Sequence, residues 1–184
     1  GRVLFYDRRL SANDRASCGS CHQQSRAFAD SLRFSRGFAG ELTGRRGMSL
    51  VNARFYDNGR FFWDERAATL EEQVLQPIQD SAEMGMTLDD AVLKVGLTPY
   101  YPALFQAAFG TPEVTSDRVS RALAQFIRSM NSTGSRFDQA FAGGPVPNFA
   151  AVFTATELRG QQLFESSRCG ECHITHAQVG NQAR

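Results

Sequence analysis

All four cysteines of this chain fall in two copies of one pattern, a Cys-x-x-Cys pair followed directly by histidine. The two copies consist of Cys18, Cys21 and His22, and of Cys169, Cys172 and His173. Cys-x-x-Cys pairs also occur in disulfides, in four-cysteine zinc sites and in thioredoxin-like redox centres, but none of these needs a histidine at the next position. Attachment of a c-type haem does, because the two thiols add to the porphyrin vinyl groups and the adjacent imidazole binds the iron. The sequence therefore predicts two covalent c-type haems, with His22 and His173 as iron ligands.

Helical patterns are expected to position both motifs. The Thr-x-x-Glu pairs at 69–72 and 154–157 are typical of a capping box at the start of a helix. Apolar residues recur at helical spacing from Val119 to Met130. Expected helices cover 70–76, ended by Pro77, then 88–96, 116–130 and a segment from about 155 that leads to the second motif. No strand signal accompanies them, so the predicted fold is mainly α with long loops.

Turn-forming residues at 143–148 favour a domain boundary at that point. We expect two cytochrome c-like haem domains, 1–142 and 143–184, each holding one haem. Residues 33–60 are rich in glycine and arginine and lack periodicity, which favours a segment that wraps over a cofactor. Only eleven residues follow His173, too few to surround a haem, so the second domain is predicted to be incomplete.

Composition excludes several classes of partner. The net charge is +1, from 20 basic and 19 acidic residues without a long run of either sign, so neither nucleic acid nor an anionic membrane is expected. The sequence contains no run of about 18 apolar residues, so it does not predict a membrane span. Covalent c-type attachment takes place outside the cytoplasm, and we expect a bacterial periplasmic protein whose signal peptide has been removed.

Several segments arranged around the two motifs carry a family resemblance. They are residues 1–11, 49–52, 62–67, 70–73, 77–78, 83–84, 122–126 and 137–138. In their order and spacing the chain resembles the bacterial dihaem cytochrome c peroxidases and their MauG-like relatives over nearly its whole length.

The resemblance implies a division of labour between the haems. The haem on His22 would react with peroxide in a pocket containing Gln73 and Glu83, while the haem on His173 would receive electrons and pass them on through Trp63. A carboxylate near the peroxide can move a proton from one oxygen to the other as general base and then acid. An amide can hold the peroxide but cannot carry that proton. Burial beside a haem is expected to raise the pKa of Glu83.

Two departures from the family pattern alter these expectations. Members of the peroxidase branch carry a distal histidine in the loop after the first motif, at a position that corresponds here to Phe38. No histidine lies between His22 and His173, so we predict an open first haem that needs no reductive activation, and Met48 is not expected to replace the missing ligand. Arg46 stands where the family commonly has a calcium-binding asparagine, which argues against calcium.

The favoured function is reduction of hydrogen peroxide to water with electrons from a small cytochrome c or cupredoxin. One alternative is a MauG-like enzyme that oxidises a partner protein through a high-valent haem state. Another is a non-enzymatic dihaem electron-transfer module, which would have two six-coordinate haems and no use for Glu83. The family resemblance also suggests a homodimer.

Overall fold

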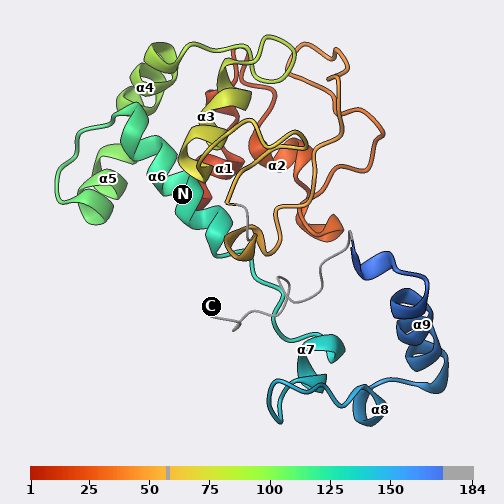
Figure 1. Cartoon of the computed structure of the whole chain (residues 1–184). Coiled ribbons are helices and arrows are strands. Elements are labelled where there is room, and N and C mark those ends of the chain that lie inside the picture. Colours follow the sequence, from red (N-terminus) through yellow and green to blue (C-terminus); the bar gives the residue numbers. More distant parts are fainter. Residues whose placement is uncertain (57–58, 172–184) are drawn as a thin grey trace. The chain divides into compact units, whose positions relative to one another are not determined.

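The computed structural model describes residues 1–56 and 59–171, and this part of the chain is helical (Figure 1). It contains no extended strand, only isolated antiparallel bridges such as Gln23 to Ala29. The mainly α prediction is confirmed. The described residues form two compact units: the first comprises 1–54 and 59–130, the second 55–56 and 131–171.

Short and long helices alternate with loops in the first unit. Up to Met130 the elements are α1 (Arg2–Tyr6), η1 (Arg8–Leu10), α2 (Cys18–Cys21), η2 (Gln24–Arg26), η3 (Ala53–Phe55), α3 (Leu70–Gln79), α4 (Leu88–Leu97), α5 (Tyr101–Phe109) and α6 (Ser116–Arg128). Helix α5 was not predicted from the sequence. It has Pro102 in its first turn and ends at Gly110, whose φ of +81° suits a glycine C-cap.

The helix starts follow the threonines that the sequence singled out. The hydroxyl of Thr69 accepts a hydrogen bond from the backbone N–H of Glu72 at 3.1 Å, and that of Thr87 accepts one from Asp90 at 3.1 Å. These bonds satisfy N–H groups that lack a partner in the first turn of a helix. Local side-chain chemistry is therefore sufficient to place these starts.

The predicted end of α3 at Pro77 is wrong, since the helix continues to Gln79 with Pro77 inside it. Proline removes one N–H donor, here the one that would bond to the carbonyl of Gln73. The following turn stays intact, because the N–H of Asp80 donates to the carbonyl of Gln76 at 3.0 Å. Packing of Ile78, which is fully buried, holds this last turn against the core.

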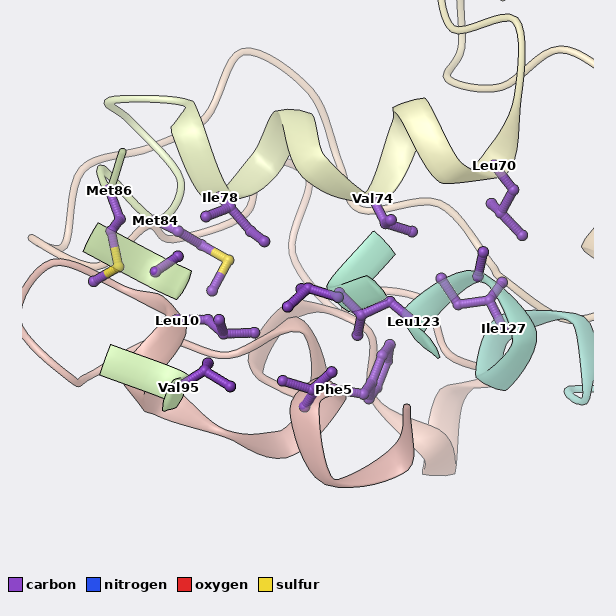
Figure 2. Close-up of a cluster of buried hydrophobic side chains, with 14 of the residues drawn as sticks. Phe5, Leu10, Leu70, Val74, Ile78, Met84, Met86, Val95, Leu123 and Ile127 are labelled. Atoms are coloured by element: carbon purple, nitrogen blue, oxygen red, sulfur yellow. The ribbon is translucent and has the colours of Figure 1, made fainter. Parts of the chain in front are cut away.

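The core of the first unit lies where α1, α3, α4 and α6 meet (Figure 2). Its most buried side chains are Phe5, Leu10, Ile78, Val95 and Leu123, each at most 1% exposed. Burying a side chain of this size contributes about 1.5–3 kcal/mol relative to leaving it in water. The core carries α1 and, directly after it, the segment that leads into the first cysteine motif.

An ion pair at the edge of this core joins α3 to α6. Arg128 donates to both carboxylate oxygens of Glu71, at 2.5 and 2.9 Å. This pairing with the Arg128 guanidinium holds the pKa of Glu71 below its usual value.

Among the described helices, none combines the length and hydropathy that crossing a membrane would require.

The second unit contains α7 (Arg136–Ala140), α8 (Phe149–Val152), α9 (Ala155–Ser166) and η4 (Cys169–Glu171). Its helices α7 and α8 pack through phenylalanine rings, with Phe137 and Phe149 centred 5.3 Å apart. The turn segment 143–148 lies inside this unit, because the N–H of Asn148 donates to the carbonyl of Ala140 at 2.8 Å. The compact units thus divide between Met130 and Asn131, and the haem-domain boundary at 142–143 stays a prediction.

Candidate haem site

Helix α2 presents the two cysteines of the first motif one turn apart. Ser17 precedes the helix and forms a reciprocal capping box with Ser20, whose hydroxyl accepts the N–H of Ser17 at 3.0 Å. Burial raises the pKa of the Cys18 thiol to about 12 and that of Cys21 to about 11. Both thiols are therefore protonated at neutral pH.

His22 follows α2 with one ring nitrogen already bonded. Its Nδ1 lies 2.9 Å from the carbonyl oxygen of Phe28. A carbonyl can only accept, so Nδ1 donates its proton in this bond. The backbone of Met48 is a second hydrogen-bond partner of the ring. Burial lowers the pKa of His22, which keeps the imidazole neutral. A neutral imidazole whose Nδ1 donates to a backbone carbonyl is the form that binds iron through Nε2, so the residues fit a c-type haem.

A strained turn brings the Phe28 carbonyl to the histidine. Ala27 and Phe28 have left-handed φ values of 53° and 56°, which non-glycine residues adopt at a cost. The N–H of Phe28 donates to the carbonyl of Gln23 at 2.8 Å and closes the turn. The strained backbone of this turn therefore places the carbonyl that orients the His22 ring.

The buried side chains of Asp30 and Ser35 and the half-buried Gly47 form a polar cluster at the edge of the same ring. The N–H of Asp30 donates to the carbonyl of Gly47 at 3.0 Å, and the N–H of Gly47 donates to the hydroxyl of Ser35 at 3.0 Å. A Cβ on Gly47 would lie 3.5 Å from Cε1 of His22 and 3.6 Å from Cβ of Asp30. Although burial opposes it, hydrogen bonding from Ser35 and Leu32 lowers the pKa of Asp30. A buried carboxylate thus lies beside the predicted iron ligand.

Sequence reasoning missed this cluster. Asp30 and Ser35 lie in a segment without periodicity, and nothing in their spacing from the motif indicates burial. Only the fold shows that Asp30 is 3% exposed and Ser35 4% exposed. An acidic residue soon after a haem motif is the one signal that could have drawn attention to it.

Gln73 lies on α3, and Glu83 lies in the turn that follows the helix. The N–H groups of Glu83, Met84 and Gly85 all donate to the carbonyl of Asp80, which makes the turn rigid. Burial raises the pKa of Glu83, as predicted, and the Asp80 carboxylate adds to the effect. The Glu83 charge also acts on both cysteine thiols and raises their pKa. Glu83 therefore lies near the first motif.

Gln73 occupies the second turn of α3 and is half-buried. Its side-chain amide makes no hydrogen bond to any other residue that the structure describes. The amide is therefore available to a ligand. Its part in a peroxide pocket stays a prediction.

Phe38 lies directly against Glu83. Its N–H donates to the Glu83 carbonyl at 2.8 Å, and its own carbonyl accepts from the side chain of Asn13 at 2.9 Å. The phenyl ring packs on Gly85, which has a φ of +65° and no room for a Cβ against that ring. A side chain that cannot bind metal thus lies at the position where the sequence comparison expected a histidine.

Trp63 is 59% exposed and is not a core residue of the first unit. Its indole N–H donates to the carbonyl of Arg46 at 3.0 Å. Beside it, Asp64 forms ion pairs with Arg45 at 3.1 Å and with Arg66 at 2.9 Å. The indole is held in one orientation at the surface, as a relay would require.

In the second motif, helix α9 leads to Cys169, as predicted. The hydroxyl of Thr154 and the carboxylate of Glu157 form the capping box that opens the helix. Cys172 and His173 lie outside the described residues, so the second iron ligand stays a prediction. The described half of this motif is exposed.

Comparison with known proteins identifies one protein family. The family model described as di-haem cytochrome c peroxidase matches residues 1–145. The chain is 35% identical to a cytochrome c551 peroxidase of Nitrosomonas europaea over 94% of this chain and 50% of that protein. It is also 35% identical to a methylamine utilization protein MauG of Methylorubrum extorquens, over 95% of this chain and 48% of that protein.

Solved structures agree with this. A MauG-like protein associated with microbial copper homeostasis superposes with a TM-score of 0.81 at 33% identity, over 94% of this chain and 50% of that one. The diheme peroxidase BthA from Burkholderia thailandensis gives a TM-score of 0.75 at 29% identity, over 89% and 45%. The chain spans about half the length of the curated relatives it matches.

Proposed function

Because the chain belongs to the di-haem cytochrome c peroxidase family, with two c-type haems as its cofactors, we propose that its protein reduces hydrogen peroxide to water. The proposal places the reaction at the haem of the first motif. The observation that carries it is a half-buried Glu83 with a raised pKa beside Phe38, whose side chain cannot ligate iron. A haem held by Cys18, Cys21 and His22 would supply the redox chemistry.

Glu83 moves the proton in this proposal. A carboxyl with a raised pKa accepts a proton from one peroxide oxygen and returns it to the other. Desolvation provides the raised pKa, and the hydrogen bonds to Asp80 hold the turn that carries the residue. Gln73 orients the peroxide through its free amide, without taking part in proton transfer.

Trp63 passes electrons toward this site from the second haem, on His173. Its orientation is held by the hydrogen bond to Arg46. We propose that the electrons come from a small cytochrome c or cupredoxin, that the protein works in the periplasm and that it forms a homodimer. Arg46, whose cation stands where a calcium-binding side chain was expected, supports a protein without calcium at that position.

A second candidate function is supported by the equal identity, 35%, to a MauG protein. In that case the same first site would oxidise a partner protein instead of drawing electrons from a small donor. The exposed indole of Trp63 would then deliver electrons from the partner toward the first site.

The test is an optical and EPR spectrum of the ferric holoprotein, followed by stoichiometric hydrogen peroxide. We expect a high-spin ferric signal from the open first site and rapid peroxide consumption. In Glu83→Gln the consumption slows by about 10²-fold or more, the usual contribution of a general acid–base group. Glu41→Gln is the matched control, because Glu41 is exposed on the loop that carries Phe38.

Two low-spin haems that do not consume peroxide would contradict the proposal and support a non-enzymatic electron-transfer module. Peroxide consumption that is equally fast in Glu83→Gln would remove Glu83 from the mechanism.

A further inference from the structure

An open groove of about 800 Å³ lies on the surface beside α1. Its lining includes Arg2, Tyr6, Asp7, Arg8, Arg9 and Tyr100. The residues Tyr6 and Tyr100 are 43% and 42% exposed, so the groove offers aromatic surface to a ligand. None of the roles assigned above to the haem motifs, Glu83, Gln73 or Trp63 uses it.

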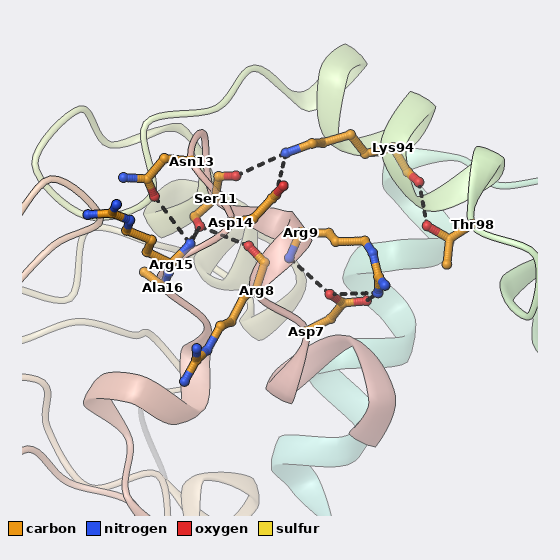
Figure 3. Close-up of polar contacts among 10 residues, drawn as sticks. All are labelled: Asp7, Arg8, Arg9, Ser11, Asn13, Asp14, Arg15, Ala16, Lys94 and Thr98. Atoms are coloured by element: carbon orange, nitrogen blue, oxygen red, sulfur yellow. Dashed lines mark hydrogen bonds and ion pairs between the residues drawn. The ribbon is translucent and has the colours of Figure 1, made fainter.

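The groove carries an excess of positive charge. Asp7 is paired with Arg9 at 3.1 Å, and Asp14 is paired with Lys94 at 2.5 Å (Figure 3). Figure 3 shows the guanidinium of Arg8 directed away from both pairs. Neither Arg2 nor Arg8 forms an ion pair with a residue that the structure describes. Two guanidinium groups therefore remain for an anionic ligand.

Tyr6 connects this groove to the first cysteine motif. A Cβ on Gly19 would lie only 2.6 Å from Cδ1 and 2.7 Å from Cε1 of Tyr6. The phenol ring therefore packs directly on the backbone between Cys18 and Cys21. Its hydroxyl makes no hydrogen bond to a residue that the structure describes, so it remains open to solvent or to a ligand.

An aromatic series also runs inward from Tyr6. The ring centre of Tyr6 is 5.1 Å from that of Phe5, and Phe5 is 6.1 Å from Phe28. The backbone carbonyl of Phe28 accepts the hydrogen bond from Nδ1 of His22. A redox-active side chain at the surface is thus joined to the first motif by two routes of close contact.

On this geometry, and resting on the peroxidase function proposed above, we propose that the groove is a second substrate site. It binds small phenols that carry a carboxylate, and Tyr6 passes their electrons one at a time to the haem of the first motif. The carboxylate pairs with Arg2 and Arg8, while the phenol ring lies against Tyr6.

The reaction balances with hydrogen peroxide as the oxidant. With a haem held by the first motif as the electron acceptor, Tyr6 would give up one electron and release its phenolic proton to solvent, and would then regain a hydrogen atom from the bound phenol. Two such events supply the two electrons and two protons that convert one peroxide to two waters. The products are two phenoxyl radicals, which couple in solution.

Binding is tested first, without peroxide, on the holoprotein. Saturation-transfer NMR compares 4-hydroxyphenylacetate with tyramine, which has the same phenol but the opposite charge. We expect the acid to bind and tyramine not to bind. Arg2→Ala combined with Arg8→Ala weakens binding of the acid by about tenfold, whereas Arg159→Ala, an exposed arginine on α9, leaves it unchanged. Equal binding of both phenols, or no loss in the double variant, overturns the anion site.

Electron passage is tested with peroxide by two rates, phenol coupling and oxidation of reduced cytochrome c. We expect Tyr6→Phe to lower the ratio of the first rate to the second by at least about tenfold. The reason is that phenylalanine lacks the phenolic hydroxyl through which tyrosine loses an electron and a proton. Tyr56→Phe is the control, because Tyr56 is 46% exposed and is not among the residues that line the groove. Without phenol, a nitroso spin trap should label Tyr6, as located by peptide mass spectrometry.

The outcomes separate the two proposals. A wild-type protein that oxidises reduced cytochrome c, but whose rate ratio is the same in Tyr6→Phe or whose trapped label lies elsewhere, overturns the Tyr6 route alone. A wild-type protein that oxidises neither substrate overturns the peroxidase proposal and this one together.

Discussion

Replacing Asp7 with asparagine should destabilise the first unit. The carboxylate is 9% exposed and accepts from the hydroxyls of Tyr101 at 2.7 Å and Tyr100 at 3.1 Å. It also accepts from the backbone and side chain of Arg9 at 2.9 and 3.1 Å. These bonds join the segment before the first haem motif to the start of α5. Asparagine keeps the shape but loses the charge that strengthens each bond.

The expected cost is about 2 kcal/mol, because hydrogen bonds to a charged group contribute about 1.5–3 kcal/mol and asparagine retains part of them. For a chain of this size that corresponds to a fall in Tm of about 4–8 °C. Thermal unfolding of the holoprotein, followed by circular dichroism, measures it. Asp89→Asn is the control, since Asp89 is exposed in the first turn of α4.

The loss should depend on pH. Burial opposes ionisation of Asp7, but hydrogen bonds from Arg9, Tyr101 and Tyr100 together hold its pKa below the usual value. A lowered folded-state pKa stabilises the protein above the unfolded pKa of about 3.9, and this contribution disappears as the pH falls through the folded pKa. The difference between wild type and Asp7→Asn should therefore be complete at pH 6 and shrink below about pH 4. A difference that stays constant over this range would refute the reasoning.

Three further changes probe the candidate site. Asp30→Asn removes the buried charge beside His22 and should raise the midpoint potential of the first haem by on the order of 50 mV in a redox titration; an equal shift in Asp64→Asn, at the surface, would contradict this. Gly85→Ala should cost about 1–3 kcal/mol in chemical unfolding, because the residue has a φ of +65° and meets Phe38; an unchanged midpoint would argue against the packing described. Phe38→His should convert the high-spin ferric EPR signal to a low-spin one and slow peroxide consumption, and a signal that stays high-spin would show that the side chain does not reach the iron.

Parts of the site were predictable because they depend on local chemistry. The haem motifs follow from residue type and spacing alone, and the threonine caps follow from which side chains can accept an N–H one turn ahead. The raised pKa of Glu83 was expected from burial beside a cofactor, and the structure confirms its direction and cause. The end of α3 was mispredicted, since packing of Ile78 outweighs the hydrogen bond lost at Pro77.

Other parts could not be predicted from one sequence. Asp30 lies beside His22 only because the 23–29 turn and the 43–47 loop fold back on each other, and no periodic pattern encodes that contact. The same holds for Tyr6, whose ring meets Gly19 across thirteen positions of sequence. The sequence by itself determined the covalent chemistry, because attachment needs only five consecutive residues. The tertiary structure alone decided which charges, rings and free side chains surround that motif, because burial and contact between distant segments depend on how the whole chain packs.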